Sequence, residues 1–191
     1  MSQDNRAETM AVKLDAYARR AGLQSDALLN AYELAVERRM AVLRDVFHPD
    51  MLHPARNVLI LLEDAEIRDP DVLLAAALTE TEYPALSFEP EAVMARFGPR
   101  AAELLAGVPV PRVARDALAE QLVTAEHDVA IIAVADRLDH ARHLHFRDQA
   151  VWRPFHAQIR AVYLPVAERV EARMAQRLAR WASSFERRFL S

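Results

Sequence analysis

The sequence predicts an all-α fold, a single-domain helical bundle, and three observations support this prediction. Apolar residues recur at three- and four-residue spacing along most of the 191 residues, and strand-like alternation is lacking. Prolines and glycines stand at the ends of these periodic stretches, where helices begin and end. Hydrophobic residues make up 52% of the chain and charged residues 27%, which is typical of a globular domain with one core.

Helix boundaries in the first half of the chain are marked by residues that start or stop helices. Gly22 ends the first periodic stretch, and Ser25 opens the second. Asp69 is a capping residue followed by a first-turn proline, and Tyr83 precedes a proline that closes the same stretch. We therefore expect helices over residues 5–21, 26–47, 53–62 and 70–83.

The second half continues in the same way. Glu89 precedes a proline that opens a helix ending at Gly98, and the next helix ends near Gly107. A proline-containing connector follows. We expect helices over residues 90–98, 99–107, 112–125, 127–144 and 153–188, the last of them interrupted or bent near Pro165.

Composition excludes several classes of protein. Only 3 glycines and no cysteine argue against a glycine-rich nucleotide loop, a disulfide scaffold and a thiolate zinc site. No run of about 18 apolar residues occurs, and the first residues lack the pattern of a signal peptide, so we expect a cytoplasmic protein. The net charge of −4 gives no general reason to bind nucleic acid or an anionic membrane, and we expect neither partner.

A carboxylate and an imidazole share one helical face in the second half of the chain. Asp136 and His140 are four residues apart, and they continue the apolar run 129–132 of a helix that reads as buried. A pair of this kind indicates half of a metal site. The alternative is a helix whose charged residues face solvent.

Other polar residues stand at helix ends, where a cavity can open. Thr79 and Glu80 follow the stretch 73–78, which is apolar on nearly every face and is expected at the centre of the bundle. Polar residues at the end of such a helix should face an internal cavity. His53 begins another helix, and its simplest explanation is a cap before Pro54.

Five motifs, in order and with matching spacing, resemble those of the HD-domain hydrolases, and within them the (p)ppGpp hydrolase domain of the RelA/SpoT group and its small stand-alone relatives. They are PDMLHP at 49–54, LLAAAL at 73–78, FGPRAAELLAGV at 97–108, ADRL at 135–138 and YLPVA at 163–167. The resemblance covers about residues 30–170 and implies an HD-domain helical bundle. It also implies that residues 1–24 are an N-terminal helical extension and that 25–191 form the HD-domain-like bundle.

The resemblance implies a metal site that has lost a ligand. The family's first metal-binding histidine is His53, and its last metal-binding aspartate is Asp136. The histidine and aspartate of the family's HD pair are here Thr79 and Glu80. This chain would therefore keep at most three of the family's ligands, His53, Glu80 and Asp136, for a divalent metal such as Mn²⁺ or Fe²⁺.

The family's catalytic positions have also changed. The glutamate and aspartate that serve the hydrolytic water are Tyr83 and Pro84 here. Proline has no acid–base group, and tyrosine, with an ordinary pKa near 10, is a poor base at neutral pH. The asparagine that helps the family bind substrate is His140. The loop that holds the guanine in the family is short or absent, so the substrate-binding residues stay unknown and no catalytic residue is expected.

Two functions remain open, and enzyme activity is uncertain. The first, which we favour, is a catalytically inactive or strongly impaired member of the fold that binds a ligand or an interaction partner, either a nucleotide or a protein. The second is a metal-dependent phosphohydrolase of (p)ppGpp or a related nucleotide, in which His140 replaces the imidazole lost at Thr79. Glu82 would then be the nearest base, but a helix turns about 100° per residue and would direct it elsewhere.

The N-terminal helix has an apolar stripe that must be covered. Met10, Leu14 and Tyr17 fall on one face of it. We expect this stripe to pack on the same domain, with dimerisation as the alternative. The oligomeric state is left open.

Overall fold

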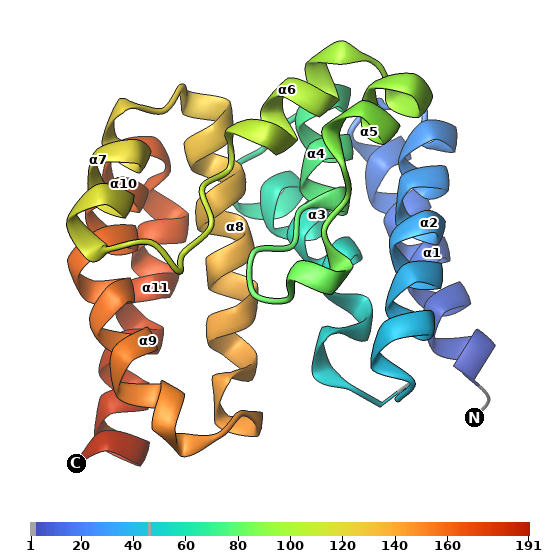
Figure 1. The fold of residues 1–191 in the computed structure, drawn as a ribbon. Helices are drawn as coiled ribbons and strands as arrows, with labels where there is room; N and C mark the ends of the chain where they lie inside the picture. The colour runs from blue at the N-terminus through green and yellow to red at the C-terminus, as the bar shows by residue number, and fades with distance from the viewer. Residues whose placement is uncertain (1–2, 46) are drawn as a thin grey trace.

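The computed structural model describes residues 3–45 and 47–191, and within these ranges it contains helices and connecting turns but no β-strand (Figure 1). The predicted all-α, single-domain fold is confirmed. None of the described helices is long and apolar enough to cross a membrane. The α-helices are α1 (Gln3–Arg20), α2 (Asp26–Leu43), α3 (His53–Asp64), α4 (Pro70–Leu78), α5 (Pro90–Phe97), α6 (Pro99–Gly107), α7 (Arg115–Thr124), α8 (His127–His143), α9 (Trp152–Gln158), α10 (Leu164–Val170) and α11 (Ala172–Phe185).

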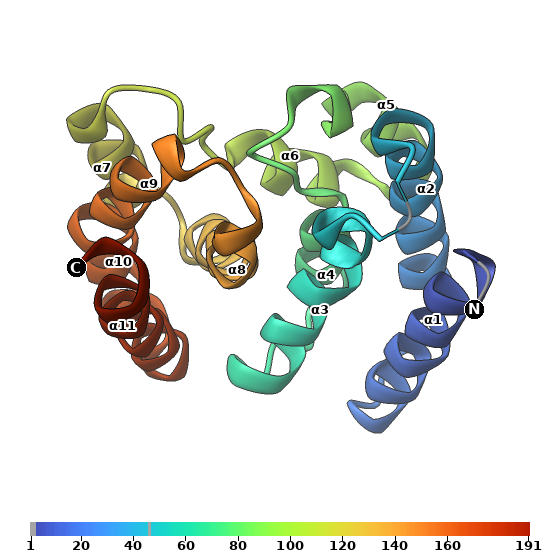
Figure 2. The same cartoon turned by 90° about the horizontal axis from the view of Figure 1, so that it is seen from below.

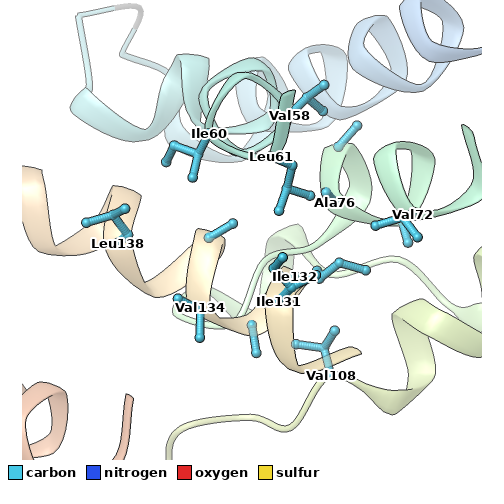
Figure 3. Packing of buried hydrophobic residues seen from close by; sticks show 14 of the residues in the cluster. Val58, Ile60, Leu61, Val72, Ala76, Val108, Ile131, Ile132, Val134 and Leu138 are labelled. Carbon is cyan, nitrogen blue, oxygen red and sulfur yellow. The ribbon is translucent and has the colours of Figure 1, made fainter. Parts of the chain in front are cut away.

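Helix α8 runs through the middle of the bundle, with α3 and α4 on one side of it and α9–α11 on the other (Figure 1). Every residue from 129 to 141 is buried, as expected of a helix surrounded by other helices. Figure 3 shows the core where three helices meet, formed by Val58, Ile60 and Leu61 of α3, Val72 and Ala76 of α4, and Ile131, Ile132, Val134 and Leu138 of α8.

Helix α1 packs on α2 and α3. Leu14 and Ala18 are fully buried there, and the Tyr32 hydroxyl of α2 donates a hydrogen bond to the Ala7 carbonyl at 3.1 Å. The apolar stripe of the N-terminal helix is thus covered within this chain. That residues 1–24 are an N-terminal extension of an HD-domain-like bundle over residues 25–191 stays a prediction.

Two helices end earlier than the sequence predicts. Helix α2 stops at Leu43 rather than at residue 47, because Arg44 takes a left-handed conformation with φ 53°. Helix α4 stops at Leu78 rather than at residue 83, and Thr79 is extended. The carboxylate of Glu80 accepts hydrogen bonds from the backbone N–H groups of Glu82 and Tyr83, at 2.8 and 3.2 Å, and so replaces helical bonds there.

The predicted long helix over residues 153–188 is wrong. Helix α9 passes through a π-helical turn, Ile159–Tyr163, into α10, and the chain then reverses at Glu171 so that α11 runs back beside α10 (Figures 1 and 2). Glu171 is extended, with φ −159°, and its side chain caps α11 by accepting from the Arg173 N–H at 2.9 Å. Pro165 lies in the first turn of α10, directly after the π-helical turn.

Candidate metal centre

Three helices and one short turn bring a set of charged side chains into the interior. We call Asp50, His53, Glu80, Asp136, Asp139 and His140 the acidic cluster. Asp50 lies in the 3₁₀ turn Pro49–Leu52, His53 begins α3, Glu80 follows α4, and the other three belong to α8. All six are at most 6% exposed. The structure thus brings together the four residues that the sequence singled out as ligands, and it adds two carboxylates to them.

His140 lies at the centre of the acidic cluster. Its Nε2 atom is 3.2 Å from Glu80 Oε1 and 3.7 Å from Asp136 Oδ1, while its Nδ1 atom is 3.5 Å from Asp50 Oδ1. Its ring stacks on that of His53 with the centroids 4.3 Å apart. Neither His140 Nδ1 nor Asp50 Oδ1 has a hydrogen-bond partner in the described part of the chain. Buried polar atoms without a hydrogen-bond partner are uncommon. These two atoms face each other 3.5 Å apart, so a proton on His140 or a bound cation would satisfy both.

His53 is oriented by residues on its far side. Its Nδ1 atom lies 2.8 Å from Asp139 Oδ2, and its Nε2 atom lies 3.1 Å from Asp136 Oδ1. Arg56 donates two hydrogen bonds to Asp139, at 2.7 and 2.8 Å, and so fixes that carboxylate in turn. A carboxylate behind one ring nitrogen is the arrangement that orients metal-binding histidines. The other nitrogen, Nε2, faces Asp136 and also lies 3.0 Å from Asn57 Nδ2.

Glu80 is held by an arginine that the sequence analysis missed. Arg39 Nη2 lies 2.9 Å from Glu80 Oε2, and both side chains are fully buried. Arg39 also donates to the Asp50 carbonyl at 3.1 Å. Helical spacing could have predicted that Arg39 points inward. It follows Val36 by three residues and Ala35 by four, and so shares their buried face of α2.

The donor atoms fit a divalent metal ion. Two overlapping sets, Asp50–His53–His140 and Glu80–Asp136–His140, each offer one ligand atom per residue, and within a set these atoms lie within 4.8 Å of one another. Imidazole nitrogens combined with carboxylate oxygens suit Mn²⁺, Fe²⁺ or Zn²⁺. The unpartnered atoms on His140 and Asp50 belong to the first set. Asp50 is a candidate ligand that the sequence analysis missed, because a 3₁₀ turn and not helical periodicity positions it.

The charges in the acidic cluster also favour a cation. Four carboxylates face two guanidinium groups, those of Arg39 and Arg56, so two negative charges are left over when both histidines are neutral. Either one divalent ion or two imidazolium protons balance them.

The second possibility, protonation of the two histidines, agrees with the direction of their pKa shifts. Burial acts to lower the pKa of His140, but the carboxylates of Glu80 and Asp136 raise it well above the ordinary value. Burial and the nearby His140 act to lower the pKa of His53, yet its hydrogen bonds to Asp136 and Asp139 raise it. The same contacts hold the pKa of the Asp50, Glu80 and Asp139 carboxyls below the usual range in spite of their burial.

Tyr83 and Pro84, which the resemblance aligns with a catalytic pair, lie beside the acidic cluster. Tyr83 is half-buried, its ring centroid is 6.3 Å from that of His140, and burial raises the pKa of its hydroxyl above the ordinary value. Pro84 is exposed and begins a 3₁₀ turn. Thr79, at the position of the missing histidine, donates its hydroxyl to the Ala75 carbonyl at 2.8 Å. None of these three side chains offers a base at neutral pH.

A second buried group of charges takes up Glu82. We call Glu82, Arg137, Arg147, Phe155 and Tyr163 the Arg137 cluster. The Glu82 carboxylate forms ion pairs with Arg137 and with Arg147, the latter at 2.7 Å. The Arg137 guanidinium lies 4.5 Å from the Phe155 ring centroid and 4.8 Å from that of Tyr163. We had assumed that Glu82 is helical, but it lies in the turn after α4. In spite of its burial, its ion pairs with Arg137 and Arg147 lower the pKa of its carboxyl and make it a weaker base.

Comparison with known proteins supports the fold. No family model matches the chain, and no curated protein matches it. A solved structure described as a metazoan ortholog of SpoT that hydrolyzes ppGpp and plays a role in starvation responses superposes with a TM-score of 0.67 at 19% sequence identity. The match covers 88% of this chain and 98% of the other. The HD-domain fold of the SpoT-like type, expected from the five motifs, is confirmed.

Proposed function

We propose that this protein is a SpoT-like HD fold whose hydrolytic centre has become a closed polar core that binds a divalent cation, and that it acts as a ligand-binding or interaction module rather than as a (p)ppGpp hydrolase. The observation that carries this proposal is the burial of all six residues of the acidic cluster, at most 6% exposed, next to a tyrosine and a proline at the catalytic positions. A substrate phosphate needs an open metal position that it can reach. The cavity of about 200 Å³ beside the site is lined by Thr79, Glu80 and Thr81 but by none of the other five residues of the acidic cluster.

The residues needed to activate water are also missing. A bound divalent ion supplies Lewis acidity and lowers the pKa of a coordinated water. His53, Glu80, Asp136 and His140, with Asp50, are the side chains that would hold such an ion. A hydrolase needs in addition a free general base within reach of the water. Glu82 is the carboxylate that could serve as this base. Its ion pairs with Arg137 and Arg147 fix its position and, in spite of its burial, lower the pKa of its carboxyl, which weakens it as a base.

The test is a hydrolysis assay with guanosine tetraphosphate and Mn²⁺, run beside a metal analysis of the purified protein. We expect bound or bindable metal but pyrophosphate release at least about two to four orders of magnitude below that of an active SpoT-type hydrolase. Robust Mn²⁺-dependent release that disappears in Asp136→Ala would overturn the proposal.

A designed variant locates the cause of the lost activity. Thr79→His combined with Tyr83→Glu and Pro84→Asp restores the residue types that the family has at these positions. Hydrolysis that appears in this variant, and not in the natural protein, would assign the loss to the three positions. Metal binding without hydrolysis in both proteins would instead place the block in the closed geometry of residues 79–83.

The second candidate function is a phosphohydrolase with an altered ligand set. The placement of His140 favours it, because this imidazole reaches both Glu80 and Asp136. Under this alternative, a screen of nucleotide substrates with Mn²⁺ would reveal an activity that His140→Ala abolishes and Glu82→Gln reduces.

A further inference from the structure

A groove lined by basic and aromatic side chains lies on the face formed by α1, α3, α8 and α11, where α3 and α11 flank α8 (Figure 2). It consists of two cavities, of about 210 and about 380 Å³, that share Arg142 as a lining residue. We call it the Arg142 groove. Its lining includes Lys13, Arg56, Glu63, Arg142, Phe189 and Arg188.

The Arg142 groove carries positive charge that the protein does not balance. Arg142, Arg188 and Lys13 are exposed and form no ion pair in the described part of the chain. The Lys13 ammonium lies 5.5 Å from the centroid of the Tyr17 ring. Glu63 is the only acidic side chain among the described residues that line either cavity.

The positive charge of the Arg142 groove is opposite in sign to the net charge of the whole chain. The whole protein has a net charge of −4, whereas residues 140–191 contain ten arginines and four acidic residues. Unpaired cations gathered in a concave surface raise the local concentration of anions. The groove is therefore suited to an anionic ligand.

The other end of the groove offers aromatic faces. Phe189 is 41% exposed, and its ring is nearly parallel to that of His145, with an angle of 14° and the centroids 6.2 Å apart. Phe146, 66% exposed, also contacts His145, with the ring centroids 4.0 Å apart. Exposed rings beside arginines form the kind of platform on which nucleobases stack. The separation of the two parallel rings is at the wide end of the range for aromatic pairs, so a small opening admits a third ring.

We propose that the Arg142 groove binds a nucleotide, with the base stacked between His145 and Phe189 and the phosphates at Arg142 and Lys13. A simple polyanion would use the cations and leave the exposed rings uncovered, and an apolar ligand would leave the arginines unpaired. Cavities of this size match small ligands better than macromolecules. The inference goes beyond the function proposed above and holds whether or not the acidic cluster binds a metal.

The test is calorimetric titration of the full-length protein with ATP and GTP in the presence of EDTA, which keeps divalent ions out of the acidic cluster. We expect at least one of the two nucleotides to bind. Adenosine or guanosine and inorganic tripolyphosphate should each bind about tenfold more weakly, because each offers only half of the contacts. Tripolyphosphate that binds as well as the nucleotide, or failure of both nucleotides to bind, would overturn the proposal. Binding of a ten-nucleotide single-stranded oligonucleotide alone would reassign the groove to nucleic acid and overturn it too.

Four variants localise the binding. Arg142→Gln and Phe189→Ala should each weaken nucleotide binding by about tenfold, through loss of a charge-assisted hydrogen bond and of a stacking face. Arg180→Gln is the matched control, since Arg180 is an exposed arginine of α11 that does not line either cavity. Its affinity should stay unchanged.

Glu63→Gln supplies a test that unfolding cannot imitate. Removal of the only acidic lining residue should strengthen nucleotide binding by about two- to fivefold, and the gain should shrink as salt is added. Unchanged affinity in Glu63→Gln, or an equal loss in Arg180→Gln and Arg142→Gln, would contradict the assignment.

Discussion

Glu80 and Glu82 are two residues apart, yet each belongs to a different buried charge cluster. Glu80 enters the acidic cluster, where carboxylates outnumber cations and where the unpartnered atoms are Asp50 Oδ1 and His140 Nδ1. Glu82 enters the Arg137 cluster, where two guanidinium groups share one carboxylate and the unpartnered atom is Arg137 Nε, a donor. The first cluster has a place for a cation and the second does not.

The difference lies in the balance of charge within each cluster. The acidic cluster keeps its charge excess, which a metal or protons must balance. In the Arg137 cluster the Arg137 guanidinium lies over the rings of Phe155 and Tyr163, and its ion pair with Glu82 holds that carboxylate in place. Under the proposed function, Glu82 is a structural residue and Glu80 is a candidate cation ligand.

The largest expected effect comes from breaking the buried ion pair of the acidic cluster. Arg39→Ala should lower the free energy of unfolding by about 3–5 kcal/mol, because it leaves the Glu80 carboxylate buried without its cation. Urea unfolding of the metal-free protein measures the loss. Arg39→Lys, which keeps the charge and loses the planar fork, should show a smaller loss and remain measurable if the alanine variant does not fold.

The neighbouring arginine is the control for this experiment. Arg38 is half-exposed, lies over the Phe88 ring and donates to the Ala85 carbonyl at 3.2 Å. Arg38→Ala should cost about 1 kcal/mol or less. Equal losses in unfolding free energy at the two positions would show that the buried ion pair stabilises the fold no more than the exposed contacts of Arg38 do.

The next effect is stabilisation by metal. Mn²⁺ at about a hundred times its dissociation constant should raise the free energy of unfolding by about 2.7 kcal/mol, which corresponds to about 5–10 °C in Tm. His140→Ala should abolish the shift, since His140 belongs to both candidate ligand sets. Asp136→Ala, which removes a ligand from one set, should at least reduce it. The same shift in all three proteins would place the ion outside the acidic cluster.

The pH dependence of stability should separate protons from metal in the acidic cluster. The folded-state pKa values of His53 and His140 are raised, so their contribution to metal-free stability is complete below pH about 6.5 and is lost as the pH rises through the folded values. The expected slope reaches about 1.4 kcal/mol per pH unit for each proton lost.

Metal should reverse the alkaline part of this profile, because it binds the neutral imidazoles. At the acid end the pKa values of Asp50, Glu80 and Asp139 are lowered, so stability should fall once the pH drops below about 4. Urea unfolding between pH 3 and 9, with and without Mn²⁺, measures both ends. A metal-free stability that rises up to about pH 6.5 and stays flat above it would mean that the histidines are neutral in the folded protein.

Sequence patterns predicted the parts of the molecule that regular periodicity controls. The spacing of Asp136 and His140 places both side chains in one cavity, because helix α8 runs unbroken through the site. The apolar stretch 73–78 indicated a central helix, and α4 is central. Its early end at Leu78 escaped prediction, since a carboxylate of the same segment, that of Glu80, replaces the helical bonds.

The residues that sequence analysis missed depend on tertiary contacts. Asp50 stood in a motif that drew attention only to His53, and its position results from a 3₁₀ turn. Arg39 lies on the inward face of α2, where a charged residue is acceptable only because Glu80 meets it from α4. The reversal at Glu171 carries neither glycine nor proline, and its surroundings are good helix formers, so packing of α11 on α10 decides it.

The smallest expected effect tests whether the two clusters are independent. Arg147 is the more exposed of the two arginines on Glu82, and Arg137 remains when it is removed. Arg147→Gln should therefore cost about 1 kcal/mol or less in unfolding free energy, the typical contribution of a partly exposed ion pair. Its stabilisation by Mn²⁺ should equal that of the unmodified protein, because Glu82 offers no atom to either ligand set. A reduced or enlarged metal shift would mean that releasing one arginine lets Glu82 act on the acidic cluster, and the carboxylate that we assign to structure would then be available for chemistry.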